Sequence, residues 1–162
     1  VMEHCISVAE ELQLPNRDKE ILKYASLLHD IGKIGIDVGI LRKPSKLSAE
    51  EWKIMIMHPV LGAGIVEQIG FLNDLAPIIL RHHERYDGKG YPGKLKKERI
   101  PLGARILSVV DAYESMVSDR PYRKALSNKK ARQELLSGSG TQFDPKIVRA
   151  FLGMLDKRKK KR

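Results

Sequence analysis

Apolar residues recur at helical spacing through much of the chain, beginning in residues 18–33, DKEILKYASLLHDIGK. One face of this predicted helix carries Ile21, Leu22, Ala25 and Leu28. Gly32 favours a stop, so His29 and Asp30 are expected to close the helix. Residues 35–46, GIDVGILRKPSK, show no such period and contain glycine and proline, so an irregular connection is expected there.

A second helix is predicted over residues 49–57, AEEWKIMIM. Ser48 precedes it and Glu51 lies three residues further on, which is the spacing of a capping box. We expect this helix to end at His58, because the ring of Pro59 disfavours helical geometry in the residue before it.

The same signals predict the remaining elements. Helices are expected over about 60–69 and 74–84, over 101–117 with Pro101 in the first turn, after Ser127, and after Asp144 with Pro145. The sequence shows no convincing alternating strand pattern, no internal repeat and no linker long enough to divide it. It therefore predicts an all-α helical bundle in one domain, residues 1–156, followed by a basic tail, residues 157–162.

The formal net charge of +10 does not by itself indicate nucleic-acid binding. Six positive charges stand in the run from Lys157 to Arg162, which is typical of a solvated tail. Aromatic residues are not interleaved with basic ones, as a single-strand binding surface requires. No apolar run reaches the roughly 18 residues of a membrane span, and the residues from Val1 onward do not resemble a signal peptide. We expect a soluble, cytoplasmic protein that does not bind nucleic acid.

Any metal site in this chain has to use nitrogen and oxygen ligands. The chain has a single cysteine, Cys5, which forms neither an internal disulfide nor a thiolate cluster. We interpret Cys5 as a small apolar helix residue.

Four of the five histidines are predicted at or near the C-terminal ends of helices, namely His29, His58, His82 and His83. A lone histidine at such a place is commonly explained by capping or by the helix dipole. His29, however, adjoins Asp30, and His82 adjoins His83 at the start of residues 82–93, HHERYDGKGYPG. Capping does not predict a neighbouring carboxylate or a second imidazole, so these residues form a candidate metal cluster.

The residue types in this cluster indicate a particular chemistry. The two oxygens of a carboxylate such as Asp30 are able to bridge two ions while imidazoles bind each ion separately. Asp111 stands among apolar positions and is costly to bury unless it is paired or bound to a metal. The mixed set suits iron, manganese or zinc, and two such ions suit phosphoester hydrolysis. Lys33 either neutralises a phosphate oxygen or is a solvated helix-end lysine, and its position favours neither.

Several stretches resemble one protein family. His29 and Asp30, followed by Ile31-Gly32-Lys33, resemble the HD motif of the HD metal-dependent phosphohydrolases. The stretch HHERYDGKGYP is similar to the signature of their HD-GYP branch, which is named after a Gly-Tyr-Pro tripeptide. The likeness continues in LRKPSKLSAEEW, MHPVLGAGI, IPLGARILSVVDAY, SDRPYR and FDPKIV, so it covers almost the whole chain.

The resemblance implies a helical bundle around two or three divalent metal ions, most often iron or manganese. It implies hydrolysis of cyclic di-GMP to pGpG or GMP in bacterial second-messenger signalling. The implied metal ligands are His29, Asp30, His58, His82, His83 and Asp111, with Asp30 bridging. Lys33 is implied at the scissile phosphate, Tyr91 at the substrate, and Arg120 and Arg123 at the substrate phosphates, where two guanidinium groups suit two phosphodiesters.

The glycine-rich loop, residues 88–93, has two interpretations. It is a tight turn, or it is functional, as a wall of the substrate pocket or as the docking surface for diguanylate cyclase (GGDEF) domains that the resemblance implies. The resemblance also implies an upstream sensory or receiver domain in the intact protein. Two other functions stay open, a phosphohydrolase acting on another nucleotide and a non-catalytic module that binds cyclase domains.

The chain departs from the family pattern at two places. The first metal-binding histidine of the family is expected upstream of Val1, and His4 lies one helical turn too late to replace it. We therefore interpret His4 as an ordinary helix residue, with its use as a substitute ligand as the alternative. For a chain that begins at Val1 we expect one metal position to be weak or empty, which leaves the activity of this chain open. Glu114 stands where relatives often carry aspartate, which keeps the charge.

Overall fold

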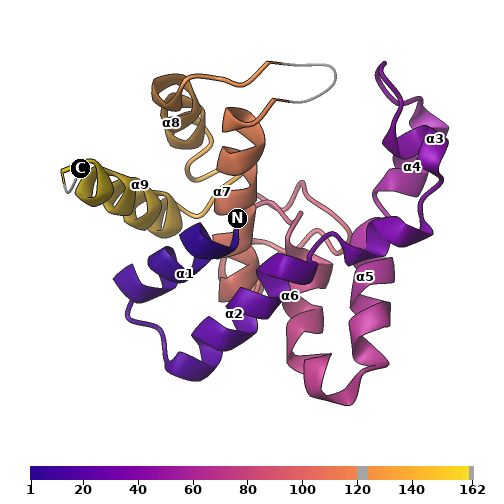
Figure 1. Ribbon diagram of the computed structural model, residues 1–162, viewed down its shortest axis with the longest axis horizontal. Coiled ribbons are helices and arrows are strands. Elements are labelled where there is room, and N and C mark those ends of the chain that lie inside the picture. Colours follow the sequence, from indigo (N-terminus) through magenta and orange to yellow (C-terminus); the bar gives the residue numbers. More distant parts are fainter. Residues whose placement is uncertain (120–123, 161–162) are drawn as a thin grey trace.

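Helices account for the regular structure throughout the computed structural model, which describes residues 1–119 and 124–160, residues 159 and 160 by their backbone alone (Figure 1). The α-helices are α1 (Met2–Glu11), α2 (Asn16–Leu28), α3 (Val38–Leu41), α4 (Ala49–Met55), α5 (His58–Glu67), α6 (Ala76–Arg81), α7 (Leu102–Val117), α8 (Asn128–Ser137) and α9 (Pro145–Lys160). Three short 3₁₀ helices are η1 (Ile31–Gly35), η2 (Gly70–Leu75) and η3 (Lys97–Arg99). The predicted all-α class is confirmed.

Helix α7 lies at the centre of the bundle, between the α1/α2/α9 group and the α5/α6 pair (Figure 1). Its buried side chains are Ala104, Ile106, Leu107, Val109, Val110 and Tyr113, and they recur at the spacing of a wide apolar face. The helix packs against α1, α2, α6, α8 and α9. Asp111 therefore projects from a helix that packs against five others.

The 3₁₀ helix η1 packs directly against the start of α5, and Gly32 makes this approach possible. A Cβ atom on Gly32 would lie 2.0 Å from the carbonyl oxygen of His58 and 2.4 Å from the backbone nitrogen of Gly62. Only a residue without a side chain fits between these two backbones. The contact brings the end of α2, with His29 and Asp30, against His58.

Helices α3 and α4 form an arm that projects beyond the start of α5 (Figure 1). The predicted capping box is present, because Glu51 N–H donates to Ser48 Oγ at 3.2 Å and Ser48 N–H donates to the Glu51 carboxylate at 2.6 Å. The predicted end of this helix was wrong. It ends at Met55, and His58 begins α5 with Pro59 in the first turn, where proline is well tolerated.

Other element boundaries also differ from the prediction. Residues 35–46 are not wholly irregular, since α3 lies within them and Asp37 caps it by accepting from Gly39 N–H at 2.7 Å. The single helix expected over 74–84 is η2 followed by the shorter α6, which has a proline in its first turn.

The basic segment 157–162 continues α9 as far as Lys160. Lys157 Nζ donates to the Glu11 carboxylate at 2.7 Å, and Arg158 donates to Ser7 Oγ at 2.7 Å. The division between domain and tail at residue 157 stays a prediction. Within residues 1–119 and 124–160, no helix has the length and apolar character that crossing a membrane requires.

Candidate metal centre

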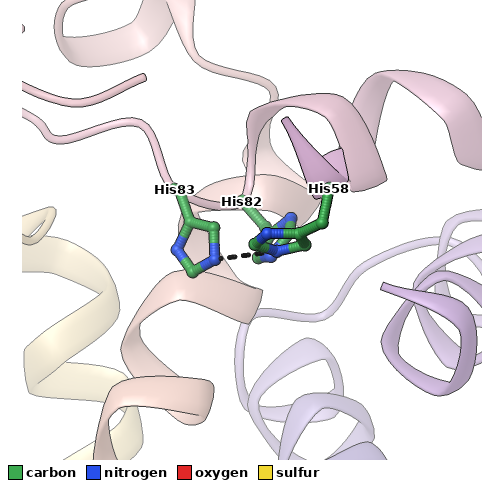
Figure 2. A group of neighbouring side chains, drawn as sticks. All are labelled: His58, His82 and His83. Carbon is green, nitrogen blue, oxygen red and sulfur yellow. Dashed lines mark hydrogen bonds between the residues drawn. The ribbon is translucent and has the colours of Figure 1, made fainter. Parts of the chain in front are cut away.

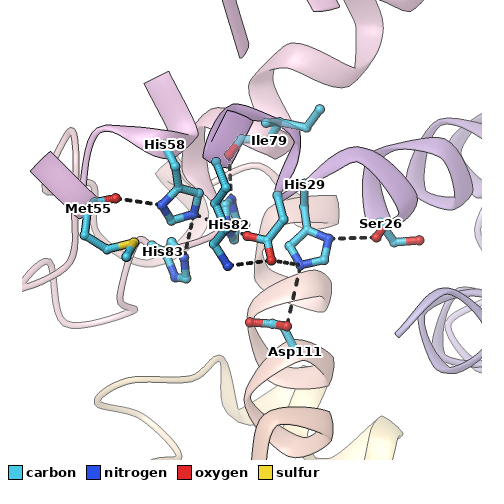
Figure 3. A network of polar contacts seen from close by, with 10 residues as sticks. Ser26, His29, Met55, His58, Ile79, His82, His83 and Asp111 are labelled. Carbon is cyan, nitrogen blue, oxygen red and sulfur yellow. Dashed lines mark hydrogen bonds and ion pairs between the residues drawn. The ribbon is translucent and has the colours of Figure 1, made fainter. Parts of the chain in front are cut away.

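His29, His58 and His82 are oriented by the same backbone contact. Nδ1 of each ring lies close to the carbonyl oxygen three residues earlier, at 2.7 Å from Ser26 O, 2.8 Å from Met55 O and 2.6 Å from Ile79 O, respectively (Figure 3). A carbonyl only accepts, so Nδ1 is the protonated nitrogen in each ring. In the neutral form of each ring, Nε2 therefore carries the lone pair that binds a metal.

His58, His82 and His83 form one compact group (Figure 2). Their candidate ligand atoms all lie within 4.8 Å of one another, and Nε2 of His83 is 3.2 Å from Nε2 of His58. Nε2 of His82 is buried and has no hydrogen-bond partner among the described residues. Burying a polar atom without a partner is costly, and a cation at this point would satisfy it.

Asp30 connects this group with a second one. Its Oδ1 lies 3.5 Å from His58 Nε2, while its Oδ2 lies 3.7 Å from His29 Nε2. His29 Nε2 is also 3.6 Å from Oδ1 of Asp111, which reaches in from α7 (Figure 3). The two oxygens of Asp30 thus face two different sets of nitrogen and oxygen atoms.

The pKa values of three histidines favour the neutral form that binds metal. Burial lowers the pKa of His82 to about 4 and that of His83 to about 2, and it also lowers the pKa of His58. These imidazoles are uncharged at neutral pH, and a neutral imidazole is the ligating species.

His29 and Asp111 behave as a coupled pair. Burial alone would lower the pKa of His29 and raise that of Asp111. The close approach of their opposite charges, 3.6 Å apart, outweighs burial, so the pKa of His29 is raised and that of Asp111 falls to about 2. The carboxylate of Asp111 is consequently ionised.

Lys33 lies at the open side of the cluster and makes an ion pair with Asp30. Its Nζ donates to Asp30 Oδ2 at 2.6 Å, and the side chain is 36% exposed. Burial alone would raise the pKa of Asp30, but the hydrogen bond and charge of Lys33 outweigh it and lower the pKa. Lys33 is therefore paired with a candidate metal ligand, and its contact with a phosphate stays a prediction.

Glu84 is a residue of the site region to which sequence reasoning gave no role. Its side chain is fully buried, and it accepts hydrogen bonds from Gly93 N–H at 2.6 Å, from Leu95 N–H at 3.0 Å and from Arg81 at 3.2 Å. It thereby holds the glycine-rich loop against the end of α6. The only sign of this role in the sequence is that a charged residue, Glu84, directly follows the two predicted ligands His82 and His83.

Tyr91 of this loop stands beside the centre. Its ring centroid is 5.0 Å from that of His83, and its backbone N–H donates to His83 O at 3.3 Å. Gly90 permits this turn, because a Cβ atom there would lie 2.3 Å from Arg85 N and 2.5 Å from His83 O. On its other side the Tyr91 ring meets Trp52 of α4, with the centroids 6.2 Å apart.

Arg120 and Arg123 fall outside the residues that the structure describes. His4 lines a cavity together with His29, but its Nδ1 is 2.6 Å from Oε1 of Glu114, so its ring is engaged in that pair. The structure thus brings together His29, Asp30, His58, His82, His83, Asp111, Lys33 and Tyr91.

These residues fit a group of divalent metal ions. Two nitrogens 3.2 Å apart have the separation expected for ligands of one ion with bonds of about 2.1 Å. The donor set of imidazoles and carboxylates suits iron, manganese or zinc. The orphaned Nε2 of His82 and the split orientation of the Asp30 oxygens point to the same use.

Comparisons with known proteins agree with the fold. A family model described as HD domain matches residues 1–147. The response regulator RpfG of Xanthomonas campestris, named a cyclic di-GMP phosphodiesterase, is 44% identical over 147 residues, which are 90% of this chain and 39% of that protein. A cyclic di-GMP phosphodiesterase of Vibrio cholerae is 42% identical over 145 residues, 85% of this chain and 30% of that protein.

Among solved structures, a HDG"Y"P protein from Bdellovibrio bacteriovorus superimposes with a TM-score of 0.77 at 20% identity, covering 96% of this chain and 50% of that one. At this identity the likeness concerns the fold. The chain spans between 30% and 39% of the length of the two named relatives that it matches.

Proposed function

Because this chain belongs to the HD domain family, we propose that it is a metal-dependent phosphodiesterase that hydrolyses cyclic di-GMP to pGpG or GMP. The observation that carries the proposal is the division of the two Asp30 oxygens between two sets of ligand atoms. A bridging carboxylate of this kind is what a centre with more than one ion requires. The names of the relatives support cyclic di-GMP as the substrate.

In this proposal each oxygen of Asp30 belongs to one half of the centre. His29 and Asp111, with Asp30, would hold one ion, and His58, His82 and His83, with the same Asp30, would hold another. When bound, such ions acidify water and stabilise the charge that develops on a transferring phosphoryl group. We propose iron or manganese as the resident metals, two or three ions in number.

The side chains around the centre orient the substrate. Lys33 uses one N–H on Asp30 and has two further N–H donors for a phosphate oxygen. Its ammonium group stabilises negative charge at the scissile phosphate. Tyr91 forms the wall of the site next to His83. Arg120 and Arg123 stay predicted contacts of the substrate phosphates.

Three further features stay predictions of the resemblance. They are the docking of diguanylate cyclase domains on residues 88–93, control by an upstream sensory or receiver domain, and location in the cytoplasm. The loop itself is fixed from within by Glu84, which leaves the exposed Lys89 for an external partner.

The decisive experiment is turnover of cyclic di-GMP by the chain reconstituted without oxygen with ferrous iron or manganese. Chromatography separates pGpG and GMP from the substrate. We expect product with the wild-type chain and none with Asp30→Ala, which removes the bridge. Asp74→Ala is the control. It removes an exposed carboxylate that pairs with Arg17 and is not a predicted ligand, so we expect it to leave turnover intact.

Each other result has a defined meaning. Faster turnover of mononucleotides than of cyclic di-GMP would support a different nucleotide as substrate. Full metal loading without any turnover would support the non-catalytic module. Equal activity of Asp30→Ala and wild type would contradict the proposed bridge.

A further inference from the structure

A pocket of about 570 Å³ lies in the arm that carries α3 and α4. Its lining residues are Ile40, Leu41, Lys43, Pro44, Ser45, Lys46, Leu47, Trp52 and Met55. The walls are mainly apolar and one of them is the half-exposed ring of Trp52. This size and character are those of a small-molecule site, for which roughly 300–1,000 Å³ is typical.

The pocket adjoins the metal centre through two of its lining residues. Met55 lines the pocket, and its carbonyl oxygen holds the Nδ1 proton of His58 at 2.8 Å. Trp52 also lines it, and the Trp52 ring meets Tyr91, which in turn packs against His83. A ligand whose reacting atom lies at the histidines can therefore place its other end in the pocket.

The charged groups at the pocket suit an aromatic ligand that carries hydrogen-bond acceptors. Its charged lining residues are Lys43 and Lys46, with no carboxylate among the lining side chains. Lys43 is bound by Glu51 at 2.6 Å, whereas Lys46 has no ion pair with any residue that the structure describes. A free ammonium group donates well to O6 and N7 of guanine.

We propose that this pocket is the subsite for one purine base of the cyclic dinucleotide, with Trp52 as its stacking surface and Lys46 as the donor to guanine. The inference rests on the proposed function, because it places the scissile phosphate at the histidine cluster. Any base can stack on the face of an aromatic ring, so Trp52 supplies affinity for the base without distinguishing guanine from adenine. Lys46 supplies the preference for guanine over adenine.

Trp52 is the single tryptophan of the chain, so its fluorescence reports on this pocket alone. The test is a titration of the manganese-reconstituted chain with GMP, with ribose 5-phosphate as the probe that has a phosphate but no base. We expect GMP to change the Trp52 emission saturably and ribose 5-phosphate to leave it unchanged. Equal effects of the two probes, or none with GMP, would overturn the subsite.

Variants separate stacking from a loss of folding. By calorimetry, Trp52→Ala is expected to weaken GMP binding roughly 5- to 150-fold, while Trp52→Phe keeps most of the affinity. Phe71→Ala removes another aromatic ring, 87% exposed on η2, and is expected to change nothing. Undiminished GMP binding by Trp52→Ala would contradict the stacking role.

Lys46→Met tests the donor, with Lys53→Met as the matched control on the exposed side of α4. We expect Lys46→Met to narrow the preference for GMP over AMP, and Lys53→Met to preserve it. An unchanged preference in Lys46→Met would remove Lys46 from the proposal.

Turnover distinguishes this inference from the proposed function. A wild-type chain that binds GMP at Trp52 but does not hydrolyse cyclic di-GMP would retain the base subsite and refute the phosphodiesterase. A chain that hydrolyses cyclic di-GMP with the same KM in wild type and Trp52→Ala would retain the phosphodiesterase and refute the subsite.

Discussion

Nζ of Lys33 lies 2.6 Å from Oδ2 of Asp30, the oxygen that also faces His29. The ammonium group of Lys33 and the proposed metal would thus share one carboxylate oxygen of Asp30. This arrangement ties the charge of Lys33 to the site where the scissile phosphate is proposed to bind.

We expect Lys33→Met to retain its metal and to lower kcat roughly 10- to 1,000-fold, because it removes one donor to developing negative charge. Metal analysis and steady-state kinetics on the same sample measure both effects. Lys19→Met on α2 is the control and should match wild type. An unchanged kcat in Lys33→Met would return this lysine to a structural role.

Asp111→Asn and His83→Gln are each expected to lower the metal content by about one ion per chain, because they belong to different halves of the centre. Asp30→Ala is expected to empty both halves. Elemental analysis after equilibrium dialysis gives the three stoichiometries. Identical losses in all three variants would mean that the centre loads as a single unit and not as two halves.

Glu84→Gln is expected to loosen the glycine-rich loop. One oxygen that accepts from Gly93 or Leu95 is replaced by a donor, which lowers the free energy of unfolding by about 1–3 kcal/mol. Chemical denaturation measures this loss, and hydrogen exchange should show faster exchange of the Gly93 and Leu95 amides. Glu67→Gln, an exposed change on α5, should leave both measurements unaltered.

Gly32→Ala is expected to lower the free energy of unfolding by about 3 kcal/mol and to disturb the metal centre. The added methyl group meets the backbone of α5 at His58 and Gly62, which has no room to yield. Gly64→Ala on the same helix is the control, because a Cβ atom there meets nothing within 4 Å. It should raise stability by about 0.5–1 kcal/mol. Wild-type stability of Gly32→Ala would show that η1 and α5 are further apart.

The thiol of Cys5 is expected to resist modification at pH 8. Burial raises its pKa to about 12, so the thiol stays protonated there and is also out of contact with solvent. A colorimetric disulfide reagent should react only after the chain is unfolded in guanidinium chloride. Stoichiometric reaction with the folded chain would show that α1 opens readily.

Sequence reasoning located the helices best where a cap stands at their start. Ser48 and Ser127 each accept from a backbone N–H three residues on, as expected of such caps. At Pro59 two rules competed, because proline both ends a helix before it and suits the first turn of the next one. The structure follows the second rule, so His58 begins α5.

The chemistry of the site was visible in the sequence, but its arrangement was not. Adjacent histidines and the His29-Asp30 pair identify the residue types of a metal centre. The two Asp30 oxygens face different ligand groups because η1 packs closely against α5. In the sequence only Gly32 indicates this packing. The contact of Trp52 with Tyr91 joins segments far apart along the chain, and the burial of Glu84 depends on how the loop after it folds back. Neither leaves a periodic signal.

The contact from Nδ1 to a carbonyl oxygen in His29, His58 and His82 has a consequence for genetic experiments. Backbone carbonyl groups orient these three rings, and a side-chain replacement leaves those carbonyl groups in place. Systematic alanine replacement of the neighbours would therefore find no residue responsible for their orientation. The orientation of the rings would instead be lost through changes that unwind the helical turn before each histidine, such as a substitution by proline there.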